Sequence, residues 1–183
     1  CNAENSVSTT GTKTGCMKWY VTKDNGSSVD VILDHNTTAT VAYETSGTYK
    51  EYAQASIKTQ VDSDTTGWSG SPRLITANEI ASITGNTTFD GSSSTWFYLD
   101  SNNQTQTATS AGASRYAWLF DYTKGCTSYG CNIEDSSTNG YWTSSSVSDY
   151  SHHAWRVFIN GTLRYDNVAN DTYCGVRPVI TIK

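Results

Sequence analysis

The closing stretch of the chain, HHAWRVFINGTLRYDNVANDTYCGVRPVITIK at residues 152–183, decides the fold. Three runs within it, AWRVFI at 154–159, TLRY at 162–165 and VRPVITI at 176–182, are rich in the β-branched and aromatic residues that strands favour. Asn160-Gly161 lies between the first two runs and supplies the positive φ that a tight turn needs. The stretch therefore predicts a β-hairpin followed by a further strand.

The side chains of residues 154–159 alternate between two faces of the predicted strand. One face is apolar and is expected to enter the core. The other face presents Arg156 and Phe158, which we expect to face solvent together with Arg164 and Tyr165. The residues expected to hold the core are Trp142, Trp155, Val157, Leu163, Val176 and Val179.

The polar and aromatic residues between these framework positions predict a binding surface. Tyr, Arg, Phe, His and Asn grouped on one surface are typical of paratopes and interface hot spots, because rigid rings give contact area at little entropic cost. The alternative is that Phe158 and Tyr165 pack beneath a loop while the charged residues only aid solubility. The candidate ligand-binding residues are Tyr150, His152, His153, Arg156, Phe158, Asn160, Thr162, Arg164, Tyr165, Asp166, Asn170, Asp171 and Tyr173.

Two helices are predicted upstream, each from residues at capping-box spacing. In the clearer one, Thr76 and Glu79 form the box, Ile75 and Ile80 flank it as a hydrophobic staple, and Gly85 ends the helix. The other helix is expected to begin at Thr48, with Glu51 completing the box, and the residues that follow near a helical period are Tyr49, Ala53, Ile57 and Val61.

The rest of the chain reads as strands and loops. Asp24-Asn25-Gly26 predicts a turn between strands at 17–21 and 29–33. The remaining strands are expected at 38–43, 94–100, 115–122 and 141–147. The pattern predicts an α+β domain, with two short helices packed on a mostly antiparallel, twisted sheet with long loops. Residues 1–15, which are rich in Ser, Thr, Gly and Asn, are expected to form a linker or N-terminal arm, and 16–183 a single domain.

Composition and motifs exclude several classes of function. The net charge of −5 leaves no basic patch for phosphates, so nucleic acid is not an expected partner. No apolar run is long enough to span a membrane, and no catalytic, phosphate-binding or cofactor motif occurs, so we expect no cofactor.

His152 and His153 are adjacent and would point to opposite faces of a strand, so they do not jointly bind a metal. Asp34-His35-Asn36 predicts an Asx-type turn, with a cation site as the weaker alternative.

The five cysteines favour an oxidising compartment. Cys126 and Cys131 bracket a short Gly-containing loop that a disulfide would close, Cys1 and Cys16 are the next plausible pair, and Cys174 is left over as a free thiol. Five free thiols in a cytosolic protein are the alternative. Cys1 at the start indicates either truncation or, less favoured, lipid modification after signal cleavage.

The runs SPRLITANEIASITG (71–85), GYWTSSSV (140–147) and GVRPVITI (175–182) resemble a large group of bacterial surface proteins. These proteins carry a C-terminal domain of C-type-lectin-like fold, related to the formylglycine-generating-enzyme group. The resemblance runs from about Cys16 to Lys183 and is closest to gut-bacterial versions that follow a type IV pilin-like N-terminal helix. It implies an extracellular or cell-surface location, with the membrane reached only through a missing N-terminal segment.

Some members of this group are the variable proteins of diversity-generating retroelements, in which Asn codons near the gene end become NNC codons. Such codons do not encode Lys, Glu, Gln, Met or Trp. None of these five types occurs at the filler positions here, which are 149–153, 156, 158–160, 162, 164–167 and 169–174. The resemblance thus implies a ligand-binding, adhesive domain that is diversified over about 149–174. It would recognise a protein or glycan on another cell or a phage.

Two alternatives belong to other functional classes. One is a structural head of a type IV pilin-like protein, whose partners would be pilus subunits and whose role would be filament assembly. The other, less favoured, is a formylglycine-generating-type enzyme. That branch uses a reactive cysteine pair, whereas only Cys174 lies near the C-terminus here, so we expect no enzymatic activity. Calcium occurs in some lectin-like relatives, but no carboxylate-rich motif in this chain demands it.

Overall fold

The computed structural model describes residues 18–38, 40–48, 51–101, 114–120, 139–170 and 172–183. Two helices and nine strands are present in these ranges, together with short 3₁₀ turns at Ser93–Thr95 and Ala117–Leu119. In chain order the elements are β1 (Trp19–Asp24), β2 (Val29–Leu33), α1 (Ser56–Asp64), β3 (Arg73–Leu74), α2 (Ala77–Thr84), β4 (Phe97–Tyr98), β5 (Gly140–Ser146), β6 (His153–Phe158), β7 (Thr162–Asn167), β8 (Cys174–Gly175) and β9 (Pro178–Ile182).

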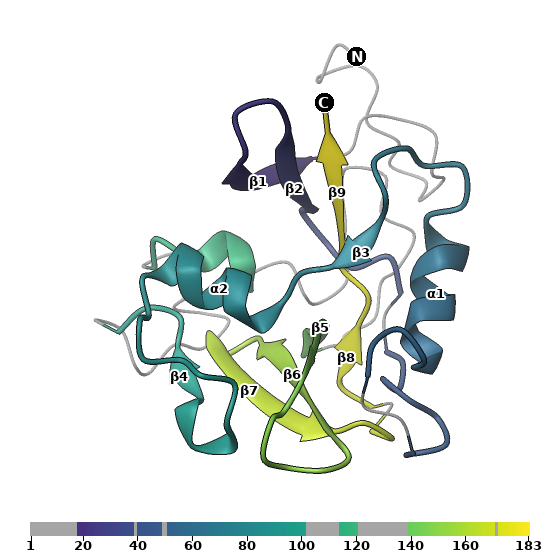
Figure 1. Cartoon of the computed structure of the whole chain (residues 1–183), viewed down its shortest axis with the longest axis vertical. Coiled ribbons are helices and arrows are strands. Elements are labelled where there is room, and N and C mark those ends of the chain that lie inside the picture. Colours follow the sequence, from purple (N-terminus) through teal and green to yellow (C-terminus); the bar gives the residue numbers. More distant parts are fainter. Residues whose placement is uncertain (1–17, 39, 49–50, 102–113, 121–138, 171) are drawn as a thin grey trace.

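The strands form two sheets, where the sequence predicted one. The first has the order β1-β2-β9-β3 and is antiparallel, and the second has the order β4-β7-β6-β5-β8, in which only the β5–β8 pair is parallel. Figure 1 shows the first sheet in the upper half of the view and the second in the lower half, with α2 on the left between them and α1 on the right. The α+β class with two helices on antiparallel and mixed sheets is confirmed.

Both predicted hairpins are present. β1 pairs antiparallel with β2 around a turn at Asn25 and Gly26, where Gly26 has a φ of 79°. β6 pairs with β7 in continuous register from His153 opposite Asn167 to Phe158 opposite Thr162, and Gly161 in the turn has a φ of 75°. The Asn-Gly dipeptides therefore mark the two turns because glycine adopts a positive φ at little steric cost.

Helix α2 begins and ends at the predicted signals. The Thr76 side chain accepts a hydrogen bond from the Glu79 backbone N–H, and the Glu79 carboxylate accepts one from the Thr76 N–H, so the capping box is complete. Gly85 ends the helix in the left-handed conformation. Ile75 and Ile80 are both fully buried, as expected of a staple.

The predicted start of the other helix is wrong. Helix α1 begins at Ser56 with Ala55 as N-cap, which makes no side-chain capping bond. The first turn is instead capped from outside, because the Glu44 carboxylate accepts the Ser56 N–H at 2.8 Å and the Tyr43 carbonyl accepts the Ile57 N–H at 3.0 Å. Ile57 and Val61 are buried on α1 as predicted, whereas Ala53 is exposed in the preceding turn and Tyr49 lies outside the described residues.

Three of the predicted strands are shorter than expected or absent. The described part of 38–43 is an extended loop whose one ladder contact is a bridge between Thr38 and Val176. Within 94–100, only Phe97–Tyr98 pairs with β7. Described residues of 115–122 form the 3₁₀ turn rather than a strand. Aromatic content marked 94–100 and 115–122 as strands, but in the described parts of these two segments only Phe97 and Tyr98 pair in a ladder.

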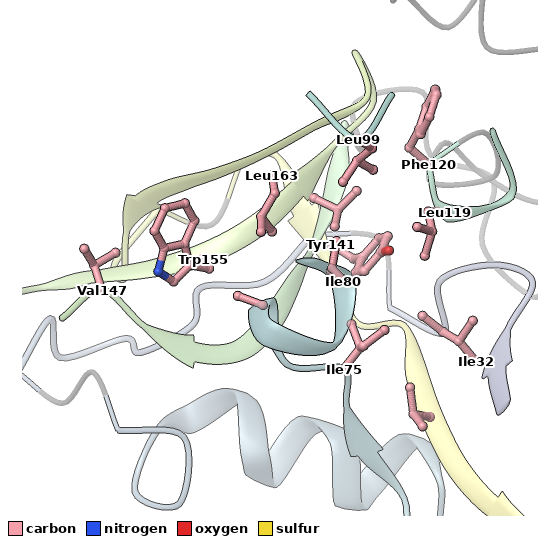
Figure 2. Packing of buried hydrophobic residues seen from close by; sticks show 13 residues of the cluster. Ile32, Ile75, Ile80, Leu99, Leu119, Phe120, Tyr141, Val147, Trp155 and Leu163 are labelled. Carbon is pink, nitrogen blue, oxygen red and sulfur yellow. The ribbon is translucent and has the colours of Figure 1, made fainter. Parts of the chain in front are cut away.

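One core cluster lies between the two sheets. It joins Ile32, Ile75, Ile80, Tyr141, Trp155 and Leu163, all labelled in Figure 2, with others from α2 and the 3₁₀ turn. The contributions come from both sheets, so this cluster fixes one sheet on the other. All six residues predicted to hold the core are fully buried: Trp142, Trp155, Val157, Leu163, Val176 and Val179.

A second core cluster covers the opposite face of β5 and β6. It contains Trp142, Ala154 and Cys174 together with Ile57 and Val61 of α1. The indole N–H of Trp142 donates to the carbonyl oxygen of Val41 at 2.8 Å, which fastens the loop before α1 to this face. The central strands are therefore buried on both faces, and the expectation that β6 has one solvent-facing side is wrong.

Arg177 ties the end of β2, the 3₁₀ turn and the start of β9 together. Its side chain is fully buried, and its guanidinium lies 5.1 Å from the centre of the Tyr141 ring. Hydrogen bonds of 2.6 to 3.0 Å run from its three nitrogens to backbone carbonyl oxygens. The residues that supply these carbonyls are Leu33, Asp34, Trp118 and Leu119.

Several predictions fall outside the described residues. These are the linker at 1–15 and the two disulfide pairs, Cys1–Cys16 and Cys126–Cys131; the single-domain boundary at 16–183 also stays a prediction. Within the described part of the chain, neither helix has the length and apolar character needed to cross a membrane.

Candidate functional site

The predicted binding residues divide between two faces and one edge of the β6–β7 hairpin. The register places Arg156, Phe158 and Arg164 on one face, whereas His153 and Tyr165 share the other face with Trp155. Residues near the Asn160 turn lie at the edge beside β4. The structure therefore does not gather all the predicted residues into one surface.

Arg156 does not face solvent, which corrects the sequence-based expectation. It is only 5% exposed, and its Nη2 lies 2.8 Å from the Asp166 carboxylate. Its Nη1 donates to the Cys174 sulfur at 3.4 Å, and Nε has no hydrogen-bond partner among the described residues. These contacts and its burial keep the guanidinium off the outer surface, so Arg156 links β6 to β7 and β8.

Phe158 links the buried arginine to an exposed one. Its half-buried ring lies 4.6 Å from the Arg156 guanidinium carbon and 5.9 Å from that of Arg164. Arg164 itself is exposed at the middle of β7. A cation over an aromatic face is attracted by the ring quadrupole, so the Phe158 ring holds both guanidinium groups on this face.

Cys174 is a free thiol, as predicted, but it is buried. Burial raises its pKa to about 11, although the nearby Arg156 lowers it in part. The thiol therefore remains protonated and shielded near neutral pH, and such a thiol is a poor nucleophile. No second cysteine accompanies it within the described residues.

An aromatic cluster occupies the other face of the hairpin. The rings of Tyr150 and His153 are stacked at 4.0 Å with an interplanar angle of 5°, and Tyr165 meets both edge-on at 5.7 and 5.6 Å. Tyr165 also contacts the core ring of Trp155 at 5.7 Å. Because Tyr150 is 46% exposed, the cluster extends from the core to the surface.

The remaining predicted residues lie around the hairpin's open end and the loop after β7. His152 precedes β6 in a turn with a φ of 60°, and its Nδ1 lies 2.6 Å from the Gly47 carbonyl, which requires Nδ1 to carry the proton. Asn170 donates to Asp166 at 3.1 Å, and Tyr173 is 44% exposed. Asp171 lies outside the described residues.

A pocket of about 340 Å³ opens beside the hairpin turn. Four predicted binding residues line it, and two further residues, Trp96 and Tyr98, complete the lining from the segment that contains β4. Sequence reasoning assigned these two rings to a strand only. The aromatic content of STWFYLD was the sequence signal for these two residues. A ring that is exposed at an edge strand is available to contact a ligand. The predicted residues in the lining are Asn160, Thr162, Arg164 and Tyr165.

The Asp34-His35-Asn36 segment is a buried bend after β2. Asp34 lies 3.3 Å from the Lys18 ammonium. Burial opposes ionisation of Asp34, but hydrogen bonds from His35 and Tyr20 and the charges of Lys18 and Arg177 hold its pKa below the ordinary value. Across the described ranges, no group of three or more His, Cys, Asp or Glu side chains is arranged to hold a metal.

The pocket beside the hairpin turn has an aromatic and polar lining, which can make non-covalent contacts with a ligand. Compared with protein-family models, curated proteins and solved structures, the chain has no significant match in any of the three.

Proposed function

We propose that this chain is a surface-displayed recognition domain that binds a protein or glycan ligand at the edge of the β6–β7 hairpin. The observation that carries the proposal is the pocket beside the hairpin turn, where Arg164 and Tyr165 meet the rings of Trp96 and Tyr98. Concave sites with rings and a few polar groups are the usual form of small-ligand sites. The sequence resembles surface proteins with a C-type-lectin-like fold, and this resemblance supports display of the site on an extracellular protein.

Rigid support of the pocket favours recognition with little loss of entropy. Three of its lining residues, Thr162, Arg164 and Tyr165, lie on β7, which pairs with β6 over its whole length. The Thr162 hydroxyl donates to the Asn160 side chain at 2.6 Å, which orders the turn. A site held in place before binding keeps more of its interaction energy, because fewer groups must be immobilised.

The proposal includes diversification of about 149–174 by a retroelement. The fold supports exchange at exposed filler positions such as Tyr150, Arg164 and Tyr173, because their loss would leave no cavity in the core. Buried filler positions such as Arg156 and Cys174 do not fit free exchange equally well. We therefore expect variation to concentrate on the exposed subset.

Sequencing the gene in sibling cells of one population tests the proposal. Differences confined to the filler positions, with most at exposed residues such as Arg164 and Tyr173, would support it, and a reverse-transcriptase gene beside a near-identical repeat would add to this support. Differences spread evenly over framework residues such as Trp142 and Arg177, or none at all among the siblings, would contradict it.

A further inference from the structure

A second pocket adjoins the first across a ridge of two aromatic side chains. Trp96 and Tyr98 line the hairpin pocket, and they also line a larger pocket of about 580 Å³ on the other side. Their rings meet edge-on at 5.8 Å, and Trp96 is 49% exposed. The two pockets thus share these two aromatic residues in their linings, and the two together are called the groove.

The larger pocket is built from residues outside the diversified stretch. Its lining includes the rings of Phe97 and Tyr116 and the hydroxyl- and amide-bearing turn after α2. In that turn the Asn86 side chain accepts two bonds of 2.9 Å from Thr88, one from its N–H and one from its hydroxyl. These polar groups are therefore held in a fixed arrangement before any ligand arrives.

The charge of the groove is opposite to that of the chain. The chain carries a net charge of −5, yet the described lining of each pocket contains one arginine and no carboxylate. These are Arg115 in the larger pocket and Arg164 in the hairpin pocket. Both are exposed and lie against aromatic rings, whereas Arg73 and Arg156 are paired with carboxylates. Arg115 and Arg164 are thus the cations that the described lining offers to an anionic ligand.

We propose that the groove binds a carboxylated oligosaccharide, with one sugar unit in each pocket. The chemistry of the lining matches such a ligand at three points. The negative ring faces of Trp96 and Tyr98 attract the polarised C–H bonds of a sugar. The guanidinium of Arg115 pairs with a carboxylate through two parallel N–H bonds. The Asn86 NH2 group can donate to sugar hydroxyls, and the hydroxyl oxygens of Thr84 and Thr88, whose protons go to other acceptors in the chain, can accept from them.

This inference rests on the proposed function, since it takes the hairpin pocket as half of the groove. The larger pocket and the hairpin pocket would recognise different parts of the ligand. Framework residues such as Trp96 and Arg115 would bind the same acidic sugar in every variant. Filler residues such as Asn160 and Arg164 would contact the neighbouring sugar unit, so the unit that binds there would differ from variant to variant.

A printed panel of uronic-acid and sialic-acid oligosaccharides, each beside its methyl ester, tests the inference with the full chain. We expect binding to at least one carboxylated member, with loss on esterification, because the ester removes the charge that Arg115 pairs with. Arg115→Gln and Trp96→Ala should each weaken this binding by about tenfold or more. Lys23→Gln and Val21→Ala, which alter an exposed cation and an exposed apolar residue on β1, are the matched controls and should leave it unchanged.

Three results would overturn the inference: no binding to any carboxylated member, equal binding to the esters, or binding that Arg115→Gln leaves intact. The proposed function is tested separately from the groove. If a ligand of any class is lost on Arg164→Ala but not on Arg115→Gln, the hairpin site stands and the shared acidic-sugar groove does not. Unfolding free energies of each variant keep loss of folding apart from loss of binding, and Arg115→Gln is at an exposed position where the fold should be retained.

Discussion

Arg177 and Arg156 are both buried arginines of the closing stretch, but the surrounding structure holds them in different ways. Arg177 gives its hydrogen bonds to four backbone carbonyl oxygens. Arg156 depends on side chains, namely the Asp166 carboxylate, the Phe158 ring and the Cys174 sulfur. Backbone carbonyls are supplied by any residue, so the contacts of Arg177 survive sequence change around it.

Contacts to backbone carbonyls are thus characteristic of the framework, and contacts to side chains are characteristic of the filler. An arginine bound to backbone fixes the fold regardless of which side chains lie nearby. An arginine bound to side chains is stable only when its partners are retained, because an unpaired buried charge is costly.

Replacing Arg177 should cause the greatest loss of stability. Arg177→Met removes the hydrogen bonds that Arg177 donates to four carbonyl groups, three of them in buried contacts, so we expect the free energy of unfolding to fall by about 4 kcal/mol or more. Urea denaturation measures it. Arg164→Met is the control at an exposed arginine and should change stability by less than about 0.5 kcal/mol. A small loss for Arg177→Met would remove the contrast between the two arginines.

Arg156 should show strong coupling to its side-chain partner. Asp166→Ala leaves the Arg156 guanidinium without its carboxylate, and we expect a loss of about 2 kcal/mol, below the full cost of a buried pair because Asp166 is partly exposed. Arg156→Met combined with Asp166→Ala should cost clearly less than the sum of the two single changes. Additive losses in this cycle would mean that the pair is not a unit.

The framework should also show a distinct sensitivity to acid through Glu79. Burial raises the pKa of this carboxyl, but hydrogen bonds from Arg73 and from the Thr76 N–H outweigh it and leave the pKa below its ordinary value of 4.5. The ionised form is therefore favoured in the fold, and its stabilising contribution is present above that value and is lost as the pH falls through the lowered pKa.

Glu79→Gln should flatten the acid limb of stability against pH, with a loss of about 1 kcal/mol at neutral pH. Measuring unfolding free energy between neutral and acidic pH for both proteins checks this. The Lys58–Asp62 pair on α1 is exposed, so Asp62→Asn serves as a control that should leave the acid limb nearly unchanged. An unaltered limb for Glu79→Gln would contradict the assignment.

Local signals predicted those parts of the fold whose partners are near in sequence. Helix α2 followed from Thr76, Glu79 and Gly85 because all of its capping groups lie within its own segment. Helix α1 did not, since the carboxylate that caps Ser56 belongs to Glu44, and this contact arises only after the loop has folded back.

The same limit explains the errors at the site. Alternation along β6 gave the correct faces, and Trp155 and Val157 entered the core. It did not reveal that β8 and the segments around α1 cover the second face, which buries Arg156. Trp96 was missed as a site residue because its proximity to Arg164 depends on the pairing of β4 with β7.

The smallest expected effect gives the most direct test of the central claim that a backbone-anchored framework supports exchangeable exposed groups. Saturation libraries at Tyr150, Arg164 and Tyr173, with a matched library at Arg177, should be displayed and sorted for resistance to protease. We predict that most substitutions at the three exposed positions change stability by less than about 0.5 kcal/mol, while nearly all at Arg177 lose the fold. Comparable losses in both libraries would contradict the account.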